Sequence, residues 1–564
     1  MSYSLSTKDY KRFELRPLSE TVETVAFEGA KLAAKALPGD LVNYKDGQVV
    51  LVSRAKHPIL AGLIELSSKV KYGFTSHNAP IYLFTPFNEA YPPFVVGCSE
   101  RDTSRNRLAL VEYGSWTETF PRGHLVRLLA PDADEEALSW TYTPAACVAY
   151  KGPLPSVANT VHRKPTPPKT FHIDPAGCRD VDDVISIYEL DGKTRLVITI
   201  ADVAAAVPEG SPLDLRAAAI AQTFYQDGNK PRHMLPPELS EGQLSLLPSA
   251  EAKLGVSLDL DINNPDDNMW YLSEVKTAET FTYESVYADP YICGHLGWLS
   301  HRLRETTDDS HKWIEIAMKF YNKEAAKLLK KHGQGLLRAH TEPDWDKLTA
   351  YSSICPDLKF LAYSAASYVP ATEESTYHWG IDTQLYTHIT SPIRRYADLV
   401  NQRALKRILL STASTASTAS TASASQETHA AQPDTTLTNH LNAVAKRAKQ
   451  HDRDLTLLRA LKANTSGTTA ATVIEIRHTA SAPDEVKLVL YSHEWKLLVR
   501  LRYNLAADGS LVSKDEKTCH RVAKSDKVQL KYYADTRARS WKKRMVLSLD
   551  SHRQVNHQSP PLSQ

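Results

Sequence analysis

Hydrophobic and β-branched residues come in short runs through the first part of this chain, and Gly, Pro, Asn and Asp separate the runs. Runs of this length predict strands, and many short strands in series are typical of small barrels. We therefore expect residues 1–150 to form one or two small β-barrels. The runs are QVVLVS (48–53), PIYLF (80–84), FVVGC (94–98), LALVEY (108–113) and HLVRLLA (124–130).

The pattern changes after residue 150. Residues 151–170 hold five prolines and little apolar sequence, which predicts an extended linker up to about residue 164. Strand and helix patterns then follow each other to residue 463, so we expect a mixed α/β catalytic core over 165–463. TRLVITIADVAAAV (194–207) has the pattern of a buried strand, and PLDLRAAAIAQTF (212–224) that of a helix.

A long helix is predicted over 311–333, where apolar residues recur at helical spacing. Lys330 and Lys331 suit the negative end of the helix dipole, and Gly333 suits the position just past the last turn. The residues that we expect on the buried face are Trp313, Ala317, Phe320 and Leu328.

Residues 411–426 form a near-perfect Ser-Thr-Ala repeat with no apolar side chain larger than alanine. Such a segment cannot offset its own ordering entropy, so we expect 411–435 to be a disordered insert in a surface loop of the catalytic domain. Helical sequence resumes near residue 437. About five further strand patterns predict an OB barrel over 467–551, followed by a flexible tail, 552–564.

Composition limits the class of protein. The 564 residues are 42% hydrophobic and 23% charged. No 18-residue apolar run is present, so we expect no membrane span. The first residues lack the apolar core of a secretory signal, and six widely spaced cysteines suit neither CxxC metal pairs nor a disulfide scaffold. We expect an intracellular, cytoplasmic protein.

Basic residues concentrate near the end of the chain, although the whole-chain net charge is only +2. Residues 521–544 contain nine Lys and Arg and two Asp, interleaved with Tyr532, Tyr533 and Trp541. Cations and aromatic rings together suit phosphates and stacked bases. The alternative is a solvated strand face.

Four aspartates lie within ten residues of one another, in the segment 171–188. Like charges this close repel, and a divalent cation with oxygen ligands would compensate them. Two ions about 4 Å apart would suit phosphodiester hydrolysis by water. An EF-hand does not fit, because Pro175 and Gly177 occupy the wrong places; a solvated acidic loop remains an alternative. The four are Asp174, Asp180, Asp182 and Asp183.

An arginine pair, Arg394 and Arg395, follows a Ser-Pro turn in YTHITSPIRRYADL (386–399). Two guanidinium groups can bind phosphate oxygens in bidentate fashion, which complements an acidic metal site. Alone, such a pair is more often a surface ion-pair donor.

Seven segments, in order and spacing, resemble the RNB domain of the ribonuclease II and R family. They span about 230 residues and are HIDPAGCRDVDD, ITIADVA, GSPLDLRA, FYQDG, MLPPELSEGQLSLLP, HWG and YTHITSPIRRYADL. The resemblance implies an α/β catalytic domain between cold-shock-type barrels and a C-terminal OB fold. TFPRGHLVRLLAP (119–131) is similar to the exosome's catalytic subunit, and we expect no other nuclease domain ahead of it.

The family resemblance implies 3′-to-5′ hydrolysis of single-stranded RNA with a free 3′ end, releasing nucleoside 5′-monophosphates. It implies Mg²⁺, or Mn²⁺ in its place, and action as a monomer or within an RNA-decay complex. The four aspartates fall on the family's acidic positions, with Asp182 closest to the chemistry. Arg394 falls on the scissile-phosphate arginine. The remaining RNA-binding positions are Arg395, His388, and the base-packing Tyr225 and Tyr283, although both tyrosines also suit a hydrophobic core.

The chain departs from the family pattern at several places. It has Leu244, Ser245 and Leu246 where the family often has CSL, and NQR at 401–403 after the arginines. It also has Ile316 in place of a second glutamate after Glu315, and Asp452 where a glutamate is usual. Two rival functions therefore stay open: an RNB-like protein that binds RNA without cutting it, and a metal-dependent enzyme acting on DNA or a cyclic nucleotide.

Overall fold

The computed structural model describes residues 2–17, 23–142, 150–155, 161–226, 229–354, 356–417, 435–479, 482–513, 518–535, 538 and 544–550. The chain divides into two compact units, and the division falls inside helix α7 (Thr435–Ala463). The first unit comprises Met1–Ala145, Ser353–Pro356 and Arg447–Gln564, and the second Ala146–Ser352 and Asp357–Lys446. Within the described residues, no helix has the length and apolar character needed to cross a membrane.

The N-terminal part of the first unit consists of two small β-structures, as the sequence predicted. Five strands form an open sheet in the order β3-β2-β1-β4-β5: β1 (Ser2–Thr7), β2 (Arg12–Pro17), β3 (Val25–Glu28), β4 (Leu41–Lys45) and β5 (Gln48–Ser53). Five more close into a barrel in the order β10-β8-β7-β6-β9: β6 (Leu60–Ile64), β7 (Ile81–Pro86), β8 (Phe94–Gly97), β9 (Arg107–Ser115) and β10 (Arg122–Leu128). Helix α1 (Asp134–Tyr142) follows the barrel.

The C-terminal part of the first unit is one antiparallel sheet in the order β26-β25-β24-β23-β22-β27-β28. Five of its strands are long, matching the five predicted: β22 (Ser466–Thr479), β23 (Ala482–Ser492), β24 (Leu497–Leu505), β27 (Lys527–Ala534) and β28 (Met545–Leu549). Sequence patterns missed the two-residue strands β25 (Leu511–Val512) and β26 (Cys519–His520).

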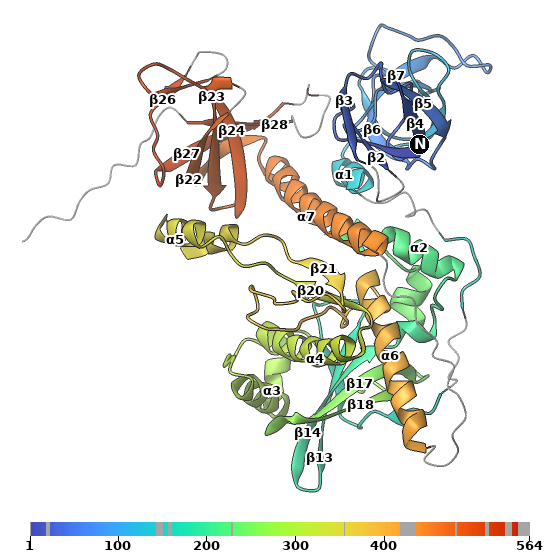
Figure 1. Cartoon of the computed structure of the whole chain (residues 1–564), viewed down its shortest axis with the longest axis vertical. Helices are drawn as coiled ribbons and strands as arrows, with labels where there is room; N and C mark the ends of the chain where they lie inside the picture. Colours follow the sequence, from blue (N-terminus) through green and yellow to red (C-terminus); the bar gives the residue numbers. More distant parts are fainter. Residues whose placement is uncertain are drawn as a thin grey trace, which may run out of the picture. The chain divides into compact units, whose positions relative to one another are not determined.

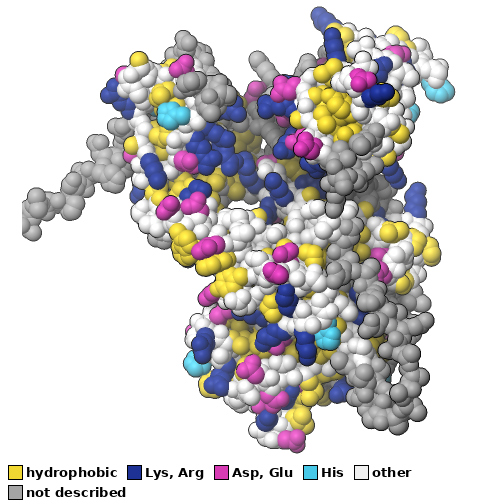
Figure 2. All heavy atoms as spheres, viewed as in Figure 1, with side chains coloured by type: hydrophobic (Ala, Val, Ile, Leu, Met, Phe, Trp, Pro, Cys, Tyr) yellow, Lys and Arg dark blue, Asp and Glu magenta, His cyan; other side chains and the backbone are white. Residues whose placement is uncertain are grey.

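The basic segment 521–544 lies partly on this sheet, where Figure 2 shows Lys and Arg side chains gathered. Lys527, Lys531 and Tyr533 are exposed on β27. Tyr532, in contrast, is buried and packs edge-on against Trp495, with ring centroids 5.2 Å apart. The expectation that Tyr532 stacks on bases was therefore wrong, because side chains alternate between the two faces of a strand. Trp541 lies outside the described residues.

The second unit is built on a seven-stranded sheet, β11-β18-β17-β14-β13-β12-β19, which Figure 1 shows beside helices α3 (Pro290–Arg302) and α4 (Ser310–His332). Its central strands β13, β14 and β17 are buried on both faces along most of their length, although β17 alternates apolar residues with Ser257, Asp259 and Asp261. The strands are β11 (Lys164–Pro165), β12 (Thr170–Ile173), β13 (Asp183–Leu190), β14 (Lys193–Ala201), β17 (Lys253–Asp261), β18 (Asn264–Val275) and β19 (Glu279–Phe281). Strand β11 lies where the sequence predicted the end of the linker.

Shorter elements complete the second unit. They are α2 (Pro212–Ile220), the pair β15 (Phe224–Gln226) and β16 (Asn229–Arg232), the pair β20 (Leu336–Ala339) and β21 (Ser367–Pro370), α5 (Trp345–Ile354) and α6 (Tyr396–Ser417). Helix α2 begins after the N-cap Ser211, whose hydroxyl accepts a hydrogen bond from the Asp214 N–H.

Helix α4 forms where the periodicity placed it. The Asp309 carboxylate caps its first turn, and Gly333 takes the left-handed conformation, φ 60°, just past its end. Trp313, Ala317 and Phe320 enter the core against the sheet, as predicted. The Tyr321 hydroxyl donates to the Val256 carbonyl of β17 at 3.0 Å, which fixes the helix to the sheet.

Helix α6 continues through Ser417, seven residues into the Ser-Thr-Ala repeat that we expected to be disordered throughout. A helix already formed by buried residues can be extended without a new nucleation cost, and alanine favours the extension. Residues 418–434 lie outside the described part of the chain.

The start of α6 is held to the end of β14 by a buried polar network. The Gln402 amide donates to the Ala201 carbonyl at 2.7 Å and accepts from the Ala204 N–H at 3.0 Å. The buried carboxylate of Asp202 binds Arg163 at 2.6 Å and Lys406 at 2.8 Å. These contacts fix the segment that follows the two predicted arginines.

We expect Asp202→Ala to lower the free energy of unfolding by about 3–5 kcal/mol, because it leaves two cations without their shared carboxylate in a buried site. Glu209→Ala, which removes a surface ion pair with Arg407, is the control and should cost less than about 1 kcal/mol. Urea-induced unfolding measures both variants. Equal, small losses would show that the Asp202 network does not hold α6.

Candidate active site

The four aspartates lie along the connection from β12 into β13, at the end of these two strands of the seven-stranded sheet. Asp174 directly follows β12, and Asp183 is the first residue of β13. Gly177 has φ 81°, a left-handed conformation that lets the loop turn back on itself. The loop is therefore formed by two strands whose registers are fixed, rather than by free surface chain.

The centre of this loop is pinned by the segment that departs from the family pattern. The N–H of Val181 donates to the Ser245 hydroxyl at 3.1 Å, and the N–H of Leu246 donates to the Val181 carbonyl at 3.0 Å. Val181 is buried, so Asp180 and Asp182 on either side of it are held in place. The Leu-Ser-Leu segment thus has a structural role that sequence reasoning missed.

Asp182 joins the acidic loop to the arginine turn, more than two hundred residues further along the chain. One of its carboxylate oxygens accepts from the Ile393 N–H at 2.9 Å, and the other accepts from Arg394 Nε at 3.3 Å. The Asp182 side chain is 4% exposed and that of Arg394 44% exposed. The arginine thus covers a buried carboxylate while part of its guanidinium faces solvent.

Burial sets the charge state of this cluster. It raises the pKa of Asp182 to about 7, although the Arg394 guanidinium and the Ile393 N–H both act in the opposite direction. Burial also raises the pKa of Asp183 well above its ordinary value, and Asp174 and Asp182 add to the rise. The protein by itself does not fully compensate these charges.

Asp174 and Asp180 have protein partners as well. The Asp174 carboxylate lies 3.0 Å from Nδ1 of the buried His172, two residues earlier in β12. Asp180 accepts a hydrogen bond from the Tyr225 hydroxyl. Because Tyr225 belongs to β15, this contact brings a third chain segment to the cluster.

Tyr225 and Arg394 are carried by neighbouring backbone segments. The N–H of Thr223 donates to the Arg394 carbonyl at 2.9 Å, and the N–H of Tyr396 donates to the Ala221 carbonyl at 2.8 Å. These bonds form a short antiparallel bridge around Arg395. Arg394 therefore lies in this bridge, and the predicted base-packing Tyr225 follows two residues after Thr223, in β15.

Arg395 and His388 are engaged within the protein. Arg395 donates to the Asp398 carboxylate at 2.7 Å, an ion pair within the first turn of α6. His388 Nδ1 lies 2.9 Å from the Tyr368 hydroxyl. Burial and the nearby Arg395 keep the pKa of His388 well below its usual range, so its imidazole is neutral at pH 7. The structure brings neither side chain into contact with the aspartates.

Tyr283 lies beside the acidic cluster but not on it. Its ring stacks on His311, with centroids 3.8 Å apart and planes 14° from parallel. Burial and the Asp174 and Asp183 carboxylates raise the pKa of Tyr283 to about 12. A half-buried ring next to the site remains suited to packing a base.

The donor set suits a hard divalent cation, because it consists of carboxylate oxygens whose charges the protein compensates only in part. Their arrangement is less complete. Across the described ranges, no three His, Cys, Asp or Glu side chains converge closely enough to enclose a metal ion. Three of the four aspartates are instead occupied by hydrogen-bond donors of the protein.

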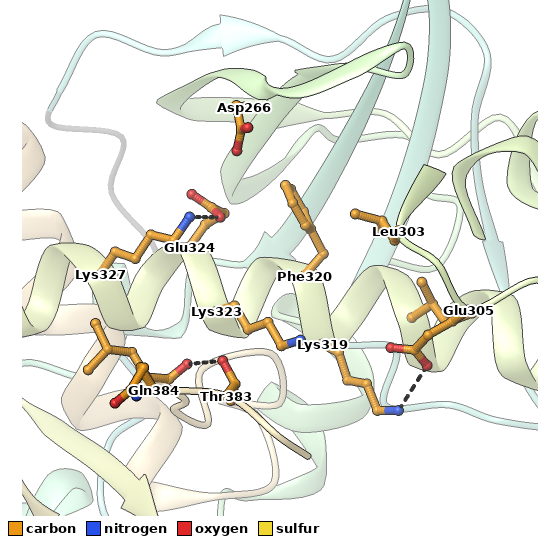
Figure 3. A pocket seen from close by; sticks show the side chains of 12 residues that line it. Asp266, Leu303, Glu305, Lys319, Phe320, Lys323, Glu324, Lys327, Thr383 and Gln384 are labelled. Carbon is orange, nitrogen blue, oxygen red and sulfur yellow. Dashed lines mark hydrogen bonds and ion pairs between the residues drawn. The ribbon is translucent and has the colours of Figure 1, made fainter. Parts of the chain in front are cut away.

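A cavity of about 330 Å³ lies on the flank of α4 (Figure 3). Its lysines are largely matched by acids: Lys319 pairs with Glu305 at 3.3 Å, and Lys327 with Glu324 at 2.6 Å. The buried Ile316 forms part of its wall. None of the aspartates or arginines singled out from the sequence lines this cavity.

Several residues that support the site carried no sequence signal of function. Asn322 of α4 accepts from the Ile389 N–H at 3.0 Å, and Asn401 donates to the Thr387 hydroxyl at 2.8 Å. Arg403 pairs with Asp214 at 2.7 Å. The NQR segment at 401–403 is therefore internal framework. Asp452 is exposed and lies 3.2 Å from His451.

Comparison with known proteins places this site within a described domain. The family model for the RNB domain matches residues 165–289 and 297–411. Ribonuclease R from Helicobacter pylori is 26% identical over 361 residues, which cover 50% of this chain and 53% of that protein. The chain spans about half the length of the curated relatives it matches.

Two solved structures share the fold. Mycoplasma genitalium RNase R in complex with ribose methylated single-stranded RNA superposes with a TM-score of 0.70 at 16% identity, covering 98% of this chain and 100% of that chain. Yeast Ssd1, a pseudonuclease, has a TM-score of 0.58 at 14% identity, covering 94% of this chain and 81% of that chain. These likenesses confirm the predicted multidomain α+β architecture with β-rich flanks.

The raised pKa of Asp182 makes a prediction about pH. A carboxyl whose folded pKa is about 7, against about 3.9 when unfolded, contributes stability below pH 4 that is lost as the pH rises towards 7. In EDTA, the melting temperature of the unaltered protein should therefore fall relative to that of Asp182→Asn between pH 4.5 and pH 7.5.

Asp261→Asn is the control for this pH series. Hydrogen bonding from the Asn263 N–H lowers the pKa of Asp261, so its contribution is complete above about pH 5. Its difference from the unaltered protein should stay flat over the same window. A flat Asp182→Asn difference as well would show that Asp182 does not titrate in that range.

Proposed function

We propose that this chain, which carries the RNB domain of the ribonuclease II and R family, is a Mg²⁺-dependent 3′-to-5′ exoribonuclease that releases nucleoside 5′-monophosphates from single-stranded RNA. The observation that carries the proposal is the contact between the buried Asp182 and the half-exposed Arg394. It puts a phosphate-binding group beside an acidic cluster, in a domain whose matched relatives are named ribonucleases.

The residues divide the work of phosphodiester cleavage. Mg²⁺, or Mn²⁺, held by Asp174, Asp180, Asp182 and Asp183 would activate the attacking water and stabilise the leaving oxygen. Arg394 would bind the scissile phosphate in bidentate geometry and hold it against the carboxylates. The Ile393 N–H would keep Asp182 oriented while Arg394 binds the phosphate, since it donates to the carboxylate oxygen that Arg394 does not contact.

Substrate choice would follow from stacking rather than base reading. Tyr225 is 41% exposed, and Tyr283 is half-buried beside the cluster. Stacking contributes about 1–3 kcal/mol per base and accepts every base, which suits an enzyme that removes any 3′ nucleotide. The exposed Lys527, Lys531 and Tyr533 of β27 would add backbone and stacking contacts.

The second candidate is an RNA-binding protein without nuclease activity. The absence of a gathered metal cluster among the described residues favours it, and so does the ion pair that occupies Arg395. Its fold is also that of a protein called a pseudonuclease. All four aspartates being present on the β12–β13 loop favours the enzyme.

A 5′-labelled oligoribonucleotide incubated with the purified protein separates the two. The enzyme should shorten it from the 3′ end only when Mg²⁺ is present, whereas a binding protein should shift it in a gel and leave it intact. Deoxyribose in the last few nucleotides should block shortening if the site requires the 2′-hydroxyl. Unhindered cleavage of that DNA end would argue for a DNA-directed enzyme.

Asp182→Asn should lower the rate of hydrolysis at least about a hundredfold. The asparagine amide is neutral, and its NH₂ group is a hydrogen-bond donor facing the Arg394 guanidinium, which is itself a donor. RNA affinity in a gel-shift assay should stay within about threefold, because RNA contacts Arg394 and the tyrosines. Asp259→Asn is the matched control: this aspartate is equally buried, binds Arg195 at 2.8 Å and lies outside the cluster. Equal loss of activity in both variants would indicate damage to the sheet rather than to the chemistry.

A further inference from the structure

We propose that RNA completes the metal site: Tyr225 and Arg394, the two side chains expected to bind RNA, hold Asp180 and Asp182 until RNA draws them away. This inference rests on the proposed function and adds an order of events to it. It accounts for an acidic loop that has the ligands for a divalent cation and yet no three of them gathered within the described residues.

The first contact involves Asp180. The Tyr225 hydroxyl donates to one oxygen of its carboxylate, and the Cys178 thiol lies 3.9 Å from the other oxygen. A hydrogen bond occupies one lone pair of a carboxylate oxygen and fixes its orientation, so it weakens the binding of a metal ion at that oxygen. Tyr225 is 41% exposed, so its ring is accessible to a base. A base that stacks on this ring and shifts it would break the bond to Asp180.

The second contact involves Asp182. Arg394 Nε donates to one oxygen at 3.3 Å, while Nη2 of the same guanidinium donates to the Ser391 hydroxyl at 3.0 Å. Both are single bonds from a group that can make two parallel bonds to a phosphate. An RNA phosphate therefore offers Arg394 a better partner, and the oxygen of Asp182 that it leaves becomes available to a cation.

The two contacts are connected through the backbone. The bridge between residues 221–223 and 394–396, with hydrogen bonds of 2.9 Å and 2.8 Å, contains Arg394 and ends two residues before Tyr225. RNA that binds one of these two residues displaces backbone connected to the other. The Ile393 N–H, at 2.9 Å from Asp182, sits on the same segment and keeps the carboxylate aimed at the cluster.

Linkage gives this arrangement a measurable consequence. If RNA removes donors that compete with the cation, RNA tightens metal binding, and the metal tightens RNA binding by the same factor. The usual strength of a hydrogen bond to a charged group, and the usual size of coupling between two sites, both suggest that each ligand lowers the dissociation constant of the other about tenfold. Without RNA, the ion would bind weakly, so no metal-bound water would be activated in the absence of substrate.

The test measures Mn²⁺ binding to the metal-free full chain by electron paramagnetic resonance of the free ion. Titrations are run with and without an eight-nucleotide RNA whose last three ribose 2′-hydroxyls are methylated, checked by chromatography to stay intact. Ions bound by the RNA alone are subtracted. The dissociation constant for Mn²⁺ should fall about tenfold when RNA is present.

Tyr225→Phe isolates the hydroxyl, since the ring that stacks on a base is kept. Without RNA, this variant should bind Mn²⁺ several-fold more tightly than the unaltered protein, and RNA should add correspondingly less. Tyr188→Phe is the matched control, because its hydroxyl also donates to an aspartate, Asp259, at 2.7 Å but outside the cluster. It should reproduce the unaltered protein in both titrations.

Mn²⁺ binding that is unchanged by RNA, or unchanged by Tyr225→Phe, would overturn the inference. Hydrolysis of unmodified RNA by the same samples is scored separately. Intact hydrolysis without coupling would discard the ordered assembly and leave the exoribonuclease standing. Coupling without hydrolysis would support the two contacts and count against the enzyme.

Discussion

The structure of the second unit depends on one contact, the buried carboxylate of Asp182 held between the Ile393 N–H and the Arg394 guanidinium. A carboxylate removed from water this completely is costly unless donors or a cation compensate it. The donors come from a turn more than two hundred residues away, so the acidic loop and the arginine turn have to be positioned together. Buried polar contacts around the site hold these two segments in position.

Two sets of buried polar residues do this positioning. On one side, the Ser245 hydroxyl and the Leu246 N–H hold the backbone of Val181, between the two inner aspartates. On the other side, Gln402 and the Asp202 ion pairs hold the first turns of α6 to the end of β14. Strand β14 pairs with β13 next to Asp183, with Asp183 opposite Ile200. The acidic loop and the start of α6 are therefore both anchored to β14.

The shared use of the aspartates explains why RNA binding and metal binding would be coupled. Tyr225 and Arg394 are both partly exposed and can contact a ligand, and each already uses an aspartate of the cluster as its partner. A ligand that satisfies the arginine and the tyrosine better than the protein does thus changes what the carboxylates can bind. Fold likeness alone does not decide this point, since both a ribonuclease and a pseudonuclease share the architecture.

The sequence by itself determined the elements and the local clusters of chemistry. Apolar periodicity placed α4, the buried strands and the β-rich flanks, and the spacing of the aspartates identified the acidic loop, because these features depend on neighbours within a few residues. Only the tertiary structure decided which groups meet. In it, Arg395 forms an ion pair with Asp398, His388 lies within hydrogen-bond distance of Tyr368, and Tyr225 donates to Asp180. Tyr532 is buried in a hydrophobic core. The Arg395–Asp398 pair is local, three residues apart, but the other pairings join residues 20 or more positions apart, so no local pattern encodes them.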